Sequence, residues 1–241
     1  MKKRFLIRGL TICLLFASLF FLGYSQDAAN TGEEAKKAGN LSDTGTLEIQ
    51  DIIIDDFEDA GSWQGQMPRD LGIIKIQARE GGAGELVKAD AEKNKFVLGA
   101  KIAYFKTGPS WFSIYPPREI QIKGITKSLS VWVAGRNFSH VLKAIIRDYN
   151  GNLRYTSFGR LAFPGWQQLT AQIPLNVVQE NYKLFSTDRP RGIRFVSFLV
   201  ECAMDETVGE YYCYLDNLSA MSDMFLDNPE NQDAHDPRDT W

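Results

Sequence analysis

The sequence predicts an all-β protein, an antiparallel β-sandwich with jelly-roll wiring. Three observations carry this prediction. About ten short runs of strand-forming residues follow one another between residues 49 and 219. Gly, Pro and Asn stand between these runs, as expected for turns that join antiparallel strands. Several runs alternate apolar and polar residues with a period of two, which buries one face of a strand.

The first half of the domain holds five predicted strands, which cover residues 49–55, 71–78, 96–105, 111–115 and 129–134. A loop with Gly and Pro follows the first strand, and Thr107-Gly108-Pro109 separates the third from the fourth. In the fifth strand Leu129, Val131 and Val133 share one parity. Trp132 has the other parity, so we expect it on the outer face, where it contacts a partner.

The second half holds five more predicted strands, which cover residues 142–148, 153–158, 166–173, 193–202 and 211–219. Asn150-Gly151 lies between the first two of these, and this dipeptide favours the positive φ angles of a tight hairpin turn. The strand over 166–173 ends at Pro174. Only residues 175–185 hint at a helix.

The two ends of the chain differ from the middle in composition. Residues 1–25 predict a secretory signal peptide, because a basic stretch precedes an apolar run shorter than the roughly 20 residues that span a bilayer. An uncleaved signal anchor is the alternative. Residues 26–47 predict a flexible leader, and 222–241 a disordered acidic tail; the alternative is a peptide arm that docks on a neighbouring subunit through Trp241. A single β-sandwich domain over 48–221 lies between them.

The charge of the chain disfavours two classes of partner. The formal net charge of −3 becomes −7 once the four basic side chains of residues 1–25 are removed with the signal peptide. Nucleic acid and anionic membrane surfaces both require a positive footprint. We therefore expect no nucleic-acid partner, and no membrane partner after the signal is cleaved.

Two cysteines near the end of the domain suggest a disulfide. If the last two strands form a hairpin centred on residues 207–208, Cys202 and Cys213 face each other. An exported protein permits a disulfide, and a loop this short would gain about 3 kcal/mol from the bridge. Two buried thiols are the alternative.

The sequence contains no pattern that predicts an enzyme. A catalytic triad needs a histidine beside a nucleophile, and the only histidines are His140, in a predicted loop, and His235, in the acidic tail. We expect His140 to be a surface or partly packed residue. No catalytic residue and no cofactor is predicted.

One acidic cluster is a candidate metal site. Asp56-Phe57-Glu58 follows the first strand, and Tyr214-Leu215-Asp216-Asn217 lies in the last one. Both segments resemble those of sugar-binding jelly rolls, such as galactose-binding and carbohydrate-binding modules. Carboxylates are the ligands that Ca²⁺ prefers, so a structural Ca²⁺ at Asp56, Glu58 and Asp216 is an alternative to ordinary polar contacts.

The aromatic residues make carbohydrate binding a second candidate function. A flat group of aromatic side chains would bind sugar rings and make the chain a lectin-like module; the candidates are Trp63, Trp111, Trp132, Trp166, Tyr115 and Tyr155. A sandwich of this size also packs tryptophans in its core, and we expect that position for Trp111 and Trp166.

The segments Tyr115–Arg118, Lys127–Phe138, Gly165-Trp166 and Tyr214-Leu215-Asp216 resemble the flagellar filament outer-layer (sheath, FlaA) proteins of spirochaetes. The likeness extends over most of residues 53–223. It implies an exported, non-enzymatic protein of the periplasmic flagellum that coats a core of flagellin-like subunits beside other coat subunits. It implies no site residues.

A coat subunit must contact both its neighbours and the core. We take as candidates for these contacts the turn after the fourth strand, the outward tryptophan, the loop over 135–140 and the tip of the tail. The residues concerned are Tyr115, Arg118, Trp132, Arg136, Asn137, Phe138 and Trp241. Such a coat would alter the stiffness and shape of the filament.

Overall fold

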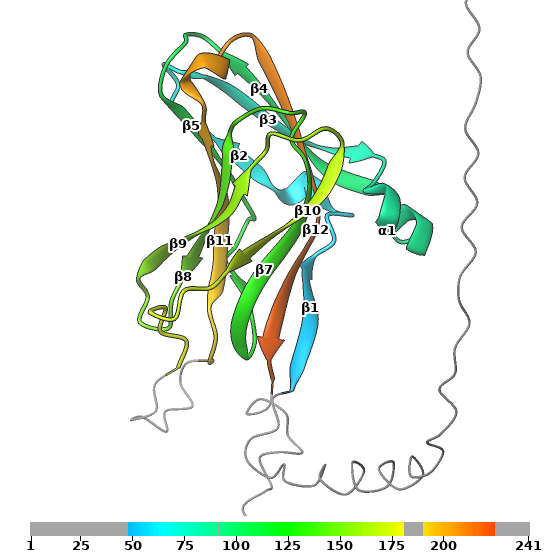
Figure 1. Ribbon diagram of the computed structural model, residues 1–241, viewed down its shortest axis with the longest axis vertical. Coiled ribbons are helices and arrows are strands. Elements are labelled where there is room, and N and C mark those ends of the chain that lie inside the picture. The colour runs from blue at the N-terminus through cyan, green and yellow to red at the C-terminus, as the bar shows by residue number, and fades with distance from the viewer. Residues whose placement is uncertain (1–47, 91, 181–189, 225–241) are drawn as a thin grey trace, which may run out of the picture. The chain divides into compact units, whose positions relative to one another are not determined.

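The computed structural model describes residues 48–90, 92–180 and 190–224, which fold into two antiparallel sheets packed face to face (Figure 1). Sheet A has the order β10 (Trp166–Gln172), β7 (Ile125–Ala134), β12 (Glu210–Asp223), β4 (Phe96–Tyr104) and β3 (Gly72–Glu80), with β1 (Ile49–Asp55) on the far half of β12. Sheet B has the order β2 (Gln64–Gln66), β5 (Ser110–Tyr115), β11 (Arg194–Cys202), β8 (Val141–Arg147) and β9 (Leu153–Arg160), with β6 (Ile120–Gln121) beside β11.

The connections cross between the sheets, as a jelly roll requires. The chain passes from sheet A to sheet B after β1, β4, β7 and β10, and it returns to sheet A after β2, β6, β9 and β11. All ten predicted strands coincide with observed ones, with small shifts at their ends. The predicted β-sandwich is therefore confirmed.

Three short elements were not predicted. Strands β2 and β6 have three and two residues, and α1 (Gly84–Ala89) lies in the connection between β3 and β4. Two 3₁₀ turns, η1 (Ala60–Ser62) and η2 (Met204–Glu206), complete the described elements. The expected helix is absent from residues 175–180, and residues 181–185 lie outside the described part.

The Asn-Gly hairpin forms where it was predicted, although only its glycine has a positive φ. β8 and β9 pair in register around it, and Gly151 adopts a φ of 89°. Beneath the turn the buried Asp148 carboxylate accepts the Asn152 N–H at 2.8 Å and pairs with the Arg154 guanidinium at 3.2 Å. The turn is thus fixed both by its backbone and by a satisfied buried acid.

The core is sealed at one side by the loop after β1. Phe57 and Trp63 enter the space between the sheets, where their rings lie 5.1 Å apart, and Trp63 stacks on Phe198 at 6.0 Å. Phe57 adopts a φ of 62°, and the Asp55 carboxylate accepts both its N–H and the indole N–H of Trp63. The polar end of the tryptophan is therefore satisfied while its ring is buried.

Several predictions concern residues outside the described part. These are the signal peptide (1–25), the leader (26–47), most of the acidic tail (222–241) and the tip at Trp241. Among the residues that the structure does describe, no helix is both long enough and apolar enough to cross a bilayer.

The expected hairpin between the last two strands is wrong. β11 and β12 lie in opposite sheets, so Cys202 pairs across with Ser110, and Cys213 with Ala100. Both cysteines are free thiols, which contradicts the predicted disulfide. Burial raises the pKa of Cys202 to about 11 and that of Cys213 to about 12.

If residues 1–25 are removed as a signal peptide, the remaining chain is expected to hold two reduced thiols. Cys213 is fully buried and should react with a thiol reagent only after unfolding, because its sulfur is both inaccessible and protonated. Thiol titration in denaturant should find two groups, and a reductant should leave the melting temperature unchanged. Finding no thiol after denaturation would instead support the predicted disulfide.

Candidate functional site

The predicted contact residues are divided between the two outer faces of the sandwich. Tyr115 points away from the core of sheet B, because Phe112 and Ile114 are its buried neighbours in β5. Arg118 is exposed in the loop that follows. Trp132 is half-exposed on the outer face of sheet A, as its parity predicts. The structure thus does not bring these residues into one site.

The loop after β7 is likewise divided. Arg136 and Asn137 are exposed and adopt φ angles of 55° and 63°. Phe138 instead turns inward, where its ring lies 4.7 Å from that of Tyr211 and 5.3 Å from that of His140. Phe138 is thus partly buried and packs against the end of the core, and its role as a contact residue stays a prediction.

Aromatic and cationic side chains gather on the outer face of sheet A. Arg136 lies 5.4 Å from the ring centres of both Tyr212 and Tyr214, and Lys101 lies 5.3 Å from that of Tyr212. On the other side of Tyr214, the ring of Trp166 is 6.5 Å away. Cations at these distances are attracted by the negative faces of the rings.

Gly99 makes room for one more cation in this group. A Cβ at Gly99 would lie 2.8 Å from Cγ of Arg79 and 3.4 Å from Cε1 of Tyr214. The missing side chain thus lets Arg79 cross over β4 and lie beside the tyrosine. We call the whole group the aromatic–cation patch; its members are Arg79, Lys101, Arg136, Trp166, Tyr212 and Tyr214.

The patch has more cations than anions. Glu210 is the carboxylate that joins it, accepting from Lys101 at 2.7 Å and from the Tyr212 hydroxyl at 2.6 Å. Within the described residues Arg79 and Arg136 form no ion pair, and the exposed Lys75 lies directly across from Lys101 in the register of β3 and β4. The patch is therefore locally positive on an acidic chain.

The outer face of sheet B has a different charge pattern. Lys143 pairs with Glu201 at 2.6 Å, and Glu119 pairs with Arg147 at 2.7 Å and with Arg194 at 3.5 Å. These cations are neutralised within the chain. Trp111 and Tyr155 are 40% and 57% exposed on this face without cations stacked on them.

The aromatic residues considered from the sequence are also divided. Trp63 is buried in the core, and Tyr115 and Tyr155 lie on sheet B. The expected core positions of Trp111 and Trp166 are wrong, because both lie on outer faces. Tyr212 and Tyr214 were missed, although they are separated by the buried Cys213 and so show the period of two that indicates a shared outer face.

The acids proposed for Ca²⁺ approach one another around β12. Asp216 is buried; its Oδ2 accepts the Ala83 N–H at 2.9 Å and its Oδ1 has no partner. Burial raises the pKa of Asp216, and the charges of Glu58 and Asp56 raise it further. These neighbours already accept backbone N–H groups, Glu58 from Lys95 and Phe96, and Asp56 from Glu58.

The donor set does not fit a calcium site. In residues 48–90, 92–180 and 190–224, no three acidic, histidine or cysteine side chains are grouped so that they could hold a metal ion. The predicted trio thus lacks the ligand cluster, and Asp216 is a buried acid that carries one orphaned oxygen.

Asp216→Asn is therefore expected to raise the free energy of unfolding at neutral pH by about 1 kcal/mol, since the amide oxygen can still accept from Ala83 without a buried charge. The raised pKa means that the native chain loses stability as pH rises through the folded-state pKa, and the variant should lack this loss. Urea denaturation at several pH values measures both effects.

The exposed Asp56 provides the control, because Asp56→Asn removes a nearby charge without changing a buried group. If Asp216→Asn lowered stability, and Ca²⁺ raised the melting temperature of the native chain alone, Asp216 would be a cation ligand after all.

His140 is a core residue, not the surface or partly packed residue expected from the sequence. Its Nδ1 accepts the Ala203 N–H at 3.2 Å, so the ring is neutral with its proton on Nε2, which lies 3.3 Å from the Tyr104 hydroxyl. That hydroxyl lies 3.2 Å from the Cys202 sulfur. Burial lowers the pKa of His140, against the opposing charges of Glu206 and Asp205.

Stability should fall on acidification below about pH 6.5, because the unfolded chain then takes up a proton that folded His140 resists. The slope contributed is at most about 1.4 kcal/mol per pH unit. His140→Gln keeps a hydrogen-bond acceptor but does not titrate, so its free energy of unfolding should depend less on pH. Equal pH slopes for the native chain and the variant would contradict this role of His140.

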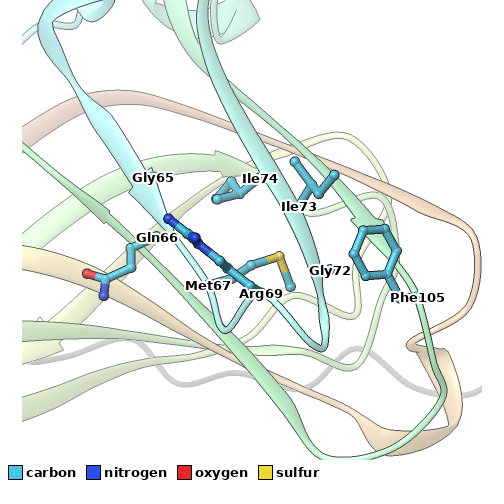
Figure 2. A pocket seen from close by; sticks show the side chains of 8 residues that line it. All are labelled: Gly65, Gln66, Met67, Arg69, Gly72, Ile73, Ile74 and Phe105. Carbon is cyan, nitrogen blue, oxygen red and sulfur yellow. The ribbon is translucent and has the colours of Figure 1, made fainter.

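A shallow hollow lies between β2 and β3 (Figure 2). It has a volume of about 530 Å³ and is lined by Gly65, Gln66, Met67, Arg69, Gly72, Ile73, Ile74 and Phe105. Arg69 is its one charged lining residue, and no carboxylate or histidine is among the residues that line it. Acid–base catalysis needs such a partner, so this hollow is not suited to it.

Comparison with known proteins gives one consistent family. The model of the family described as flagellar filament outer layer protein FlaA matches residues 26–229. A flagellar filament outer layer-like protein of Brachyspira hyodysenteriae is 43% identical over 220 residues, which is 90% of this chain and 100% of that protein.

Solved structures give weaker matches. A carbohydrate-binding module of the β-sandwich superfamily is 13% identical, with a TM-score of 0.47, over 69% of this chain and 60% of that one. The family 11 carbohydrate-binding module of a Clostridium thermocellum cellulase is 12% identical, with a TM-score of 0.43, over 74% of this chain and 96% of that one.

Proposed function

The chain belongs to the FlaA family of flagellar filament outer layer proteins, and on that premise we propose that it is an exported structural subunit that coats the filament in the periplasm. It lies on a core of flagellin-like subunits and beside other coat subunits. Its partners are proteins, and the acidic mature chain has no nucleic-acid or membrane partner in this proposal.

The observation that carries the proposal is the aromatic–cation patch. Protein interfaces are enriched in Tyr, Trp and Arg, and these residues dominate binding energies. The patch joins Trp166, Tyr212 and Tyr214 to Arg79 and Arg136 on a flat sheet face. These rings are half-exposed and rest on a rigid strand, so little ordering is needed when a partner covers them.

A subunit in a layer needs at least two contact surfaces, one toward the filament beneath and one toward its neighbours. The two outer faces of this sandwich differ in charge, since Lys143, Arg147 and Arg194 are paired on sheet B, whereas cations are in excess at the patch on sheet A. Two unlike faces allow the two contacts to be made by different partners. In this proposal the added contacts stiffen the filament and set its shape, so filaments from a deletion strain should be thinner and altered in curvature.

We propose no enzymatic activity. Both thiols have raised pKa values and stay protonated at neutral pH, which disfavours a cysteine nucleophile. His140 is neutral and enclosed by Tyr104, Tyr211 and Phe138. These observations support a binding role rather than catalysis.

Carbohydrate binding is the second candidate, because aromatic side chains on either outer face could stack on sugar rings. A sugar site would require aromatic faces open to the ligand. In the patch, however, Arg136 and Lys101 already lie over the tyrosine rings. We therefore favour a protein partner.

We expect the mature chain to sediment saturably with filaments isolated from cells that lack it. Trp166→Ala with Tyr214→Ala should weaken this binding about tenfold or more, because two anchors of the contact are removed. Tyr155→Ala with Trp111→Ala removes two rings from the other face, and a smaller effect of this pair would assign the filament contact to the patch. Retention on periplasmic glycans without filament binding would move the assignment to a lectin-like module.

A further inference from the structure

The patch has positive charge that the described domain does not neutralise. Three cations surround two tyrosines, and Glu210 is the single carboxylate in their contacts. Exposed ion pairs contribute little singly, but several charges facing an opposite field select the partner and its register. The partner that fits this surface is an acidic chain that also carries apolar or aromatic side chains.

The sequence itself contains such a segment. Residues 225–241 hold five acids and one arginine; the acids are Asp227, Glu230, Asp233, Asp236 and Asp239. Phe225 and Trp241 flank these acids. This segment therefore offers carboxylates for Arg79, Lys101 and Arg136, and rings for the aromatic members of the patch.

The position of the exit from the fold favours the patch of a neighbour over the chain's own patch. β12 starts beside the patch and runs 14 residues, and it ends beside the start of β1, where the Met224 N–H donates to the Glu48 carbonyl at 2.8 Å (Figure 1). Tyr214 thus lies about 30 Å from the exit at 3.3 Å per residue. The chain leaves β12 heading away from its own patch.

We propose that the acidic segment 225–241 of one copy docks on the aromatic–cation patch of the next. The inference rests on the proposed function, because it supplies the lateral contact of the coat. An extended segment of this length spans at most about 60 Å, which is enough to cross to an adjoining subunit.

The contact links unlike surfaces, the segment of one copy and the patch of another. A contact of this type leaves a free patch at one end of an assembly and a free segment at the other, so it continues into an open row unless the rotation closes a ring. Open rows suit a layer that follows a filament.

Two full-length mature variants separate the halves of the contact. In the first, the five acids of the segment become Asn or Gln, so this variant can bind only through its patch. In the second, Arg79→Glu and Arg136→Glu reverse the charge of the patch, so this variant can bind only through its segment. Arg69→Glu with Arg160→Glu, outside the patch, is the matched control, since both arginines are exposed and neither forms an ion pair in the described part.

Sedimentation velocity at low salt should show concentration-dependent oligomers for the native chain and the control. Each variant alone should remain monomeric. An equimolar mixture of the two should form dimers that grow no further, because one functional segment and one functional patch are used up in each. Raising the salt to about 0.5 M should weaken the association about tenfold, because exposed charges are screened.

The proposal is overturned if the native chain stays monomeric, which is also the result expected if the segment docks on the patch of its own chain. Variants that associate like the native chain, or a mixture that stays monomeric, also overturn it. The proposed function is judged separately by filament co-sedimentation. Mixed dimers without filament binding would support the contact between segment and patch but exclude the proposed coat function. Filament binding without mixed dimers would support the coat function but exclude this contact.

Discussion

The pairing of β12 at the centre of sheet A is the constraint on which the rest of the structure depends. This strand bonds to β7 along one edge and to β4 and then β1 along the other. Its inward side chains, Tyr211, Cys213 and Leu215, belong to the core, while Tyr212 and Tyr214 face outward. A single strand thus fixes both the core and the candidate interface. A shift of one residue in the register of β12 would turn its core side chains outward and its outer side chains inward.

A bulge keeps this arrangement consistent over so long a strand. The register with β7 shifts between Asp216 and Ser219, and Asn217 adopts a φ of 43°. The extra residue changes the parity, so Leu218 and Ala220 return to the core below the bulge. At the same point Asp216 is buried under the connection that contains α1, which explains why an acid on an outward position has almost no exposure.

Local patterns in the sequence predicted the strands, the Asn-Gly hairpin and the outward position of Trp132, because each depends on neighbouring residues alone. Pairing depends on topology, which a single sequence does not contain. Cys202 and Cys213 were expected across a hairpin, yet the chain changes sheets between them. Trp166, expected in the core, lies on an outer face, and the ring of Phe138 packs against the end of the core, because the surroundings of each come from distant strands. Arg136 was predicted as a contact residue, whereas Arg79 and Lys101 were missed, because both lie near the tyrosines only through the pairing of β3, β4 and β12.

In the assembled filament, the outer face of sheet A should be covered by another subunit. Site-specific photo-crosslinking in intact filaments can test this, with the crosslinking residue placed at Tyr214 and, for comparison, at Tyr155 on the opposite face. We expect Tyr214 to form crosslinks to a coat or core protein of the filament. Crosslinks from Tyr155 but none from Tyr214 would show that the outer face of sheet A is not the interface.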